Sequence, residues 1–143
     1  MKSNFLKASI LTLATIFTIS CSKDESSNTT QNSTTTTSTV TTFAKFTVAT
    51  PAGVVKPNYI VMMFETPFTP NTPLPTIIKQ ATSDANGIAN LDLNTVITST
   101  TLKKYYFEAF TQSGTTYTLK TNFSRFDSDL KKGSNLTTTL LVN

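Results

Sequence analysis

Few side chains in this 143-residue chain could carry out chemistry. The chain has no histidine, which excludes His-based catalytic triads, the commonest general base near neutral pH and most zinc-site patterns. What remains is Cys21 and the carboxylates that follow residue 42, namely Glu65, Asp84, Asp92, Glu108, Asp127 and Asp129. A glycosidase needs two carboxylates that converge across a cleft, and a domain of about 100 residues offers little room for one. We therefore expect no catalytic residue, no cofactor and no enzymatic activity.

Two short acidic stretches could supply oxygen ligands to calcium. Asp84-Ala85-Asn86 and Asp127-Ser128-Asp129 both place such groups at alternate positions. A full calcium site needs six or more ligands, and most such triplets are ordinary turns with Asx hydrogen bonds. We expect turns at both places and no metal, with calcium as the alternative.

The distribution of basic residues bears on nucleic-acid binding. The chain carries a formal charge of +4, but its basic residues are scattered and acids occur among them at a similar density. A nucleic-acid footprint needs a clustered basic face, and no phosphate-cradling glycine run is present. We expect no nucleic-acid partner.

The first 20 residues have the organisation of a secretory signal peptide. Lys2 and Lys7 precede about a dozen mostly apolar residues, a run shorter than the roughly 20 that a transmembrane helix needs. A buried amphipathic helix is the alternative, but the apolar residues would surround such a helix and would not form one stripe. We expect export, and removal of residues 1–20 lowers the formal charge from +4 to +2 because Lys2 and Lys7 are lost.

The single cysteine lies where the apolar run ends. An exported chain with one cysteine cannot form an internal disulfide, which leaves a free thiol, an intermolecular bridge or a modified residue. Thr18-Ile19-Ser20-Cys21 resembles a bacterial lipoprotein lipobox, with Thr18 where Leu is usual. The resemblance implies cleavage before Cys21 and lipid attachment to it. Two or more acyl chains give stable membrane attachment.

A short charged cluster follows the cysteine. Lys23, Asp24 and Glu25 resemble the export signal of Bacteroidota lipoproteins, which directs them to the outer face of the outer membrane. The alternatives are a solvated spacer and a domain that faces the periplasm. We expect residues 21–42 to form a linker. Within it, residues 26–42 are all polar except Val40. We expect a disordered tether with an end-to-end distance of about 20–25 Å and a stretched length of about 60 Å.

The pattern changes at Phe43 to short runs rich in β-branched and aromatic residues, separated by Pro, Gly, Asn and Asp. Residues 59–64 are apolar on both faces, as in a central strand covered on both sides. Asn86-Gly87 favours a tight hairpin turn, and the prolines between residues 67 and 75 favour an irregular loop or a strand edge. The strands are expected at residues 43–49, 59–64, about 76–83, 89–93, 104–112, 115–123 and 136–142. We predict one all-β domain, residues 43–143, built as an antiparallel β-sandwich of about seven strands.

Most aromatic residues of this domain fall on apolar strand faces and are expected in its core. Tyr106 and Phe110 share a face with Lys104, Glu108 and Gln112, and would be exposed if that face looks outward. Tyr106 and Phe110 are therefore the candidates for a surface contact.

Three stretches carry a resemblance to a known domain family. Residues 81–93, the aromatic run 105–110 and the closing run 135–140 resemble the carboxypeptidase regulatory-like, or transthyretin-like, β-sandwich. A general immunoglobulin-like sandwich is the alternative. The resemblance implies a β-sandwich fold. Because the residues after 42 offer no catalytic set, we expect a lipid-anchored outer-membrane protein with a noncatalytic domain that binds a protein or glycan, serves adhesion or is an accessory subunit of a surface complex. A small glycan- or peptide-processing hydrolase and a purely structural periplasmic lipoprotein are the other readings.

Overall fold

A computed structural model describes residues 39–121 and 125–143. The predicted signal peptide, Cys21 and most of the linker lie outside these residues. The described part is all-β, with eight strands and no helix. The strands are β1 (Phe43–Ala49), β2 (Ile60–Phe64), β3 (Lys79–Thr82), β4 (Ile88–Asp92), β5 (Lys103–Ser113), β6 (Thr116–Leu119), β7 (Phe126–Leu130) and β8 (Asn135–Leu141).

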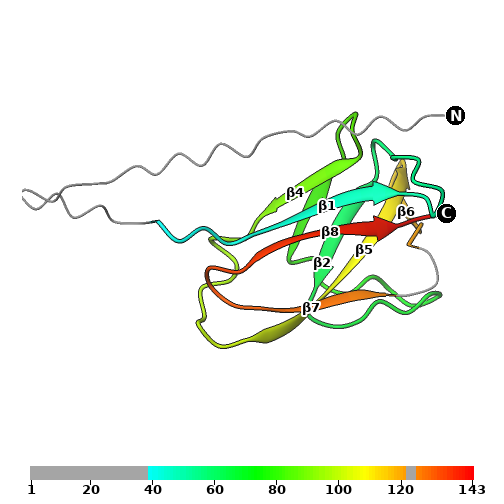
Figure 1. Ribbon diagram of the computed structural model, residues 1–143. Coiled ribbons are helices and arrows are strands. Elements are labelled where there is room, and N and C mark those ends of the chain that lie inside the picture. The colour runs from blue at the N-terminus through cyan, green and yellow to red at the C-terminus, as the bar shows by residue number, and fades with distance from the viewer. Residues whose placement is uncertain (1–38, 122–124) are drawn as a thin grey trace, which may run out of the picture. The chain divides into compact units, whose positions relative to one another are not determined.

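The strands form two sheets (Figure 1). The first sheet has the order β4-β1-β8, and the second has the order β3-β2-β5, with both β6 and β7 paired to β5. All strand pairs are antiparallel except β1 and β8, which run parallel with Phe43 opposite Asn135. The expectation of a wholly antiparallel domain is therefore wrong at this pair. Parallel neighbours need a long crossover, and here all the other strands lie between β1 and β8 in the chain.

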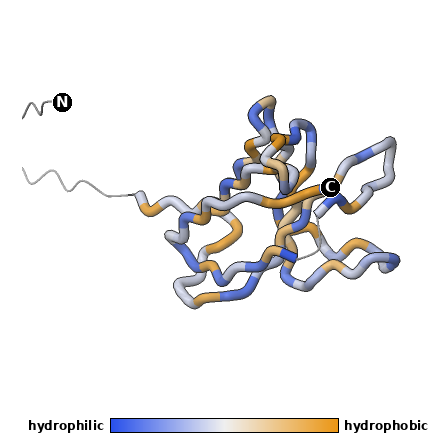
Figure 2. Tube along the Cα trace, turned by 45° about the vertical axis from the view of Figure 1, so that its right-hand side comes forward, coloured by the Kyte–Doolittle hydropathy of each residue, from blue (hydrophilic) through white to orange (hydrophobic). Residues whose placement is uncertain are grey.

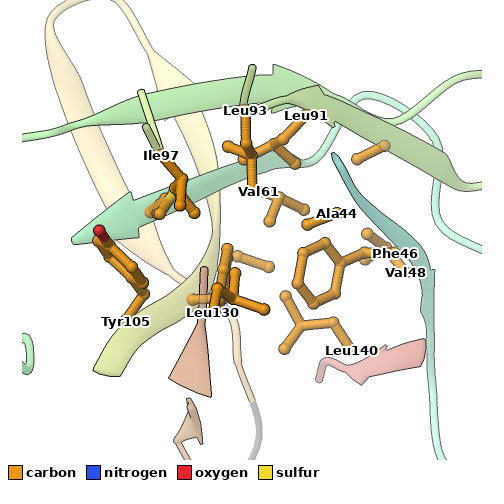
Figure 3. Close-up of a cluster of buried hydrophobic side chains, with 14 of the residues drawn as sticks. Ala44, Phe46, Val48, Val61, Leu91, Leu93, Ile97, Tyr105, Leu130 and Leu140 are labelled. Atoms are coloured by element: carbon orange, nitrogen blue, oxygen red, sulfur yellow. The ribbon is translucent and has the colours of Figure 1, made fainter. Parts of the chain in front are cut away.

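The main core lies between the two sheets because inward-facing side chains alternate along the strands. On β1, Ala44, Phe46 and Val48 are fully buried, and β8 contributes Leu140. Side chains such as Val61 and Tyr105 from the second sheet point into the same interior (Figure 3). The rings of Phe46 and Phe107 join the two sheets, with centroids 4.9 Å apart. Burial of each such side chain contributes about 1.5–3 kcal/mol.

The central strand β2 is buried on both faces, as its sequence predicts. Val61 and Met63 face the main core, whereas Met62 and Phe64 face the opposite side of the second sheet. That outer side is covered by residues 65–78, which connect β2 to β3 and are called the covering segment below. The prediction of an irregular loop at its prolines is confirmed. Figure 2 shows hydrophobic and hydrophilic residues mixed along the strands, as expected when apolar side chains alternate with polar ones.

The strand β7 was not expected from the sequence. Asp127-Ser128-Asp129 was predicted to form a turn, but these residues lie in β7, where they pair with the first half of β5. Ser128 faces inward opposite Tyr105, and the two aspartates face outward. Aspartate is depleted in strands, and the period-two pattern of Phe126, Ser128 and Leu130 is weak. The prediction of a turn is therefore wrong, and the strand count is eight.

The turn at Asn86-Gly87 is tight, as predicted, but it is not a hairpin. Asp84 Oδ1 accepts hydrogen bonds from the backbone N–H groups of Asn86 (2.9 Å) and Ile88 (2.8 Å), and Gly87 has φ of 74°. The turn leads from β3 in one sheet to β4 in the other. It therefore connects the two layers. Local turn residues specify a reversal of the chain, but they do not specify which sheet receives the next strand.

The other predicted strands are confirmed with shifted ends. Residues 43–49 coincide with β1, and β5 extends the predicted 104–112 by one residue at each end. The strand predicted at about 76–83 is confined to β3, because the covering segment occupies its start. The strand predicted at 115–123 ends at Leu119 in β6, and Phe123 lies outside the described residues.

Candidate functional site

The residues assigned to membrane attachment and export lie outside the described part of the chain. Cys21, Lys23, Asp24 and Glu25 precede residue 39, where the description begins. Their roles stay predictions from the sequence.

The proposed surface contact through Phe110 is wrong. Phe110 is 0% exposed and packs against the rings of Phe64, Phe68 and Tyr117 at centroid distances of 6.3, 5.6 and 6.4 Å. The face that carries Phe110 does point away from the main core, but Phe68 and Leu74 of the covering segment bury it. Tyr106 lies on the same face and is half-buried. A partner could reach at most part of Tyr106 there.

Glu108 is a buried carboxyl group that the sequence pattern did not single out. It lies on β5 between Tyr106 and Phe110, on the outer face of the second sheet, and is 2% exposed. Burial raises the pKa of Glu108, while a hydrogen bond with Thr121 and the charge of Arg125 partly oppose that rise. Thr121 also accepts a hydrogen bond from the backbone N–H of Ala109 at its Oγ1 (2.7 Å). Glu108 therefore lies between two aromatic neighbours with a pKa above its ordinary value.

Two other carboxylates form ion pairs with lysines of β5. Glu65 lies 2.7 Å from Lys103 Nζ, and Asp127 lies 2.9 Å from Lys104 Nζ. All four side chains are about half exposed, so water and salt screen each pair and its contribution to stability is small. The hydrogen bonds to these carboxylates raise the pKa of both lysines.

The remaining predicted acids serve local structure or stay on the surface. Asp84 holds its turn as described above. Asp92 Oδ1 accepts hydrogen bonds from Asn94, from its backbone N–H (3.0 Å) and from its amide Nδ2 (2.8 Å). Asp129 is exposed on β7. Within residues 39–121 and 125–143, no three His, Cys, Asp or Glu side chains gather as a metal site.

A pocket of about 400 Å³ lies where the two ends of the covering segment approach each other. Its lining residues are Glu65, Thr66, Pro75, Thr76 and Ile78. The backbone N–H of Ile78 donates to the carbonyl of Met63 (2.9 Å), which holds the second end of the segment against β2. The pocket residues lie about ten positions apart in the sequence, so only the folded segment brings them together. We call this site the Glu65–Ile78 pocket.

The Glu65–Ile78 pocket has the chemistry of a binding site. Glu65 offers carboxylate oxygens, Thr66 and Thr76 offer hydroxyl groups, and Pro75 and Ile78 offer apolar surface. Lys103 adds a positive charge beside Glu65. Such a mixture suits a ligand with hydroxyl or amide groups on an apolar frame.

In the part of the chain that the structure describes, no helix is long and apolar enough to cross a membrane. Comparisons with models of protein families, with curated proteins and with solved structures found no match to this chain.

Proposed function

We propose that this chain is an outer-membrane lipoprotein, attached through lipid on Cys21, with a noncatalytic domain that binds a protein or glycan ligand. In this account Lys23, Asp24 and Glu25 direct the protein to the outer face of the membrane. Residues 21–42 are the tether, and the two sheets form a transthyretin-like or immunoglobulin-like β-sandwich. The packing of both sheets around Phe46 and Phe107 supports the sandwich.

The Glu65–Ile78 pocket is the observation that carries the binding role. It combines a carboxylate, two hydroxyl groups and two apolar side chains in a hollow of about 400 Å³. The covering segment is held at two places, since Phe68 packs on the outer side of the second sheet and the backbone N–H of Ile78 donates to Met63 of β2. A rigid frame lowers the entropy that a binding site loses when its ligand binds.

Binding can be tested with the full lipoprotein purified in detergent and applied to glycan and peptide arrays. Thr76→Trp fills the pocket, and Thr116→Trp on β6 is the matched control, because both threonines are exposed. We expect retention of a glycan or peptide by the unmodified chain, a loss of at least about tenfold in affinity with Thr76→Trp, and little change with Thr116→Trp. Equal binding by both variants would place the ligand elsewhere.

The same arrays separate the binding role from the hydrolase reading. Release of cleaved product with repeated turnover would establish a hydrolase and contradict our proposal.

Proteolysis of intact cells separates the surface lipoprotein from the structural periplasmic one. We expect the domain to be degraded from outside, and its complete survival would favour the periplasmic face.

A further inference from the structure

The strand β8 forms an edge of its sheet, and within residues 39–121 and 125–143 part of this edge has no partner strand. Alternate residues of a strand direct their N–H and C=O groups to opposite sides. Ser134 C=O and Val142 N–H bond to β1, whereas Asn143 N–H bonds to Lys120 on the opposite side. The backbone N–H and C=O groups of the even-numbered residues of β8 therefore point toward β1. Those of the odd-numbered residues point toward the opposite edge of the strand.

Among the described strands, none pairs with the part of this edge from Asn135 to Thr139, which is called the free edge below. Beyond it, Val142 forms a bridge with Thr121, and Asn143 bonds to Lys120. Among residues 39–121 and 125–143, no strand pairs with the backbone of Asn135, Thr137 or Thr139 on this side. The outward side chains of these three residues are exposed.

The other edge strands carry features that discourage pairing with a further strand. Short length and charged side chains protect sheet edges. Strand β3 has four residues and begins at Lys79, β4 has five and ends at Asp92, β6 has four, and β7 contains Asp127 and Asp129. Strand β8 has seven residues with neither charge nor proline. It lacks the protection that the other edges have.

The main core is also incompletely covered beside this edge. The inward side chains of β1 are fully buried, but those of Leu136 and Thr138 on β8 are only half-buried. Phe126 of β7 is half-buried as well, and its ring packs against Phe46 at a centroid distance of 5.7 Å. Because Phe46 is the partner of Thr138 in the β1–β8 ladder, these exposed surfaces lie on one flank of the core.

We propose that the Asn135–Thr139 edge pairs with the same edge of a second copy of this chain, antiparallel and with Thr137 on the two-fold axis. Thr137 then lies opposite Thr137 of the other copy, and Asn135 lies opposite Thr139. These odd-numbered residues are the ones whose backbone groups face outward, so each facing pair can exchange two hydrogen bonds. The two β4-β1-β8 sheets become one continuous sheet.

The composition of the edge favours a second copy over another partner strand. A two-fold interface places each side chain opposite one from the same short segment. In Asn135–Thr139 no like charges meet, and the threonines form cross-strand pairs that stabilise sheets. On the inner face, Leu136 of one copy lies opposite Thr138 of the other, which covers the half-buried flank. The edge is therefore complementary to itself.

The test uses the full chain with Cys21→Ser, which excludes dimers linked through Cys21, purified in detergent and measured by sedimentation over a concentration series. We expect a reversible dimer. Thr137→Lys places two like charges opposite each other on the axis and should weaken dimerisation by at least about tenfold. Asn90→Lys, an exposed change on β4 at the other edge of the same sheet, should leave it unchanged. Circular dichroism checks that both variants fold.

Crosslinking then tests the register. Thr137→Cys in the Cys21→Ser chain should form an intermolecular disulfide under mild oxidation, whereas Asn90→Cys should form little. A chain that stays monomeric at every concentration would contradict the proposal, and so would a dimer that Thr137→Lys and Asn90→Lys affect equally. Pairing of β8 with a different protein while the chain itself stays monomeric would also overturn it.

Discussion

Glu108 places an ionisable group where water hardly reaches it, between Tyr106 and Phe110 on the outer face of the second sheet. A carboxylate there loses hydration, which is why its pKa rises. The folded chain consequently binds the proton of Glu108 more tightly than the unfolded chain does. This difference links the stability of the domain to pH.

The sign of this linkage gives a prediction. Above the ordinary pKa of 4.5, the folded state holds more protons at Glu108 than the unfolded state, so this group lowers the free energy of unfolding as pH rises. Glu108→Gln should remove that component, and its advantage over the unmodified chain should grow from about pH 4.5 upward. Denaturant titrations from pH 4 to 8 measure this, with Glu65→Gln as the exposed control. Parallel stability curves for Glu108→Gln and the unmodified chain would contradict the account.

Gly87 allows a second prediction at the residue scale. Its φ is 74°, and an added Cβ would lie 2.8 Å from the carbonyl oxygen of Val48 and 2.9 Å from Cβ of Val55. Gly114 has a similar φ of 59° but nothing within 4 Å of such a Cβ. Gly114→Ala should cost about 1–2 kcal/mol of unfolding free energy through the backbone alone. Gly87→Ala should cost at least about 1 kcal/mol more, because of the steric overlap.

Thermal or denaturant unfolding of the two alanine variants checks this difference. The comparison cancels the backbone strain that both glycines share. Equal costs would mean that the turn shifts to accommodate the methyl group, and the tight connection between the layers would not be as rigid as described.

At the scale of elements, the covering segment buries the apolar outer face of the second sheet. Phe68 is 8% exposed and packs on Phe110, so the segment is anchored by an aromatic contact. Without it, Met62, Phe64 and Phe110 would form an exposed apolar face. The Glu65–Ile78 pocket depends on the same anchoring, because its lining belongs to the two ends of the segment.

Phe68→Ala should therefore lower the free energy of unfolding by about 3–5 kcal/mol, the range for loss of a buried aromatic side chain. Leu102→Ala is the matched control, since Leu102 is 60% exposed and its truncation should cost less than about 0.5 kcal/mol. Denaturant unfolding measures both. A cost for Phe68→Ala no larger than that for Leu102→Ala would show that the segment is not held by this residue.

Particular elements show how far the sequence predicts this fold and its candidate site. The strands at residues 43–49, 59–64, 89–93 and 136–142 are predicted from the sequence and confirmed as β1, β2, β4 and β8, because burial acts directly on their side chains. The pairing of β1 with β8 could not be read, since it depends on chain directions set by the whole topology. The burial of Phe110 was missed for a related reason. Nothing in a local pattern indicates that a distant proline-rich segment will cover that face, and the pocket in that segment was missed with it.

At the scale of the whole molecule, we propose that residues 21–42 tether the folded domain to a membrane. The two depend on different sequence signals. The domain follows from alternation and burial, whereas the proposed attachment depends on Cys21 and the proposed export signal on Lys23, Asp24 and Glu25. These can be tested separately.

Replacement of Lys23, Asp24 and Glu25 with alanine should leave the protein on the periplasmic face of the outer membrane and should not change its folding. Labelling of intact cells with a membrane-impermeant reagent measures this, and labelling after lysis is the control for the amount of protein. We expect strong loss of labelling on intact cells alone. Unchanged labelling would reduce the cluster to a spacer and would leave the lipid anchor unaffected.

The lipid anchor is the central claim, and the mass of the N-terminal peptide of the membrane-extracted protein tests it most directly. The account predicts a peptide that begins at Cys21 and carries acyl chains, and predicts that Cys21→Ala abolishes both the cleavage and the added mass. A mature chain that begins elsewhere, or a Cys21 peptide without lipid, would contradict it.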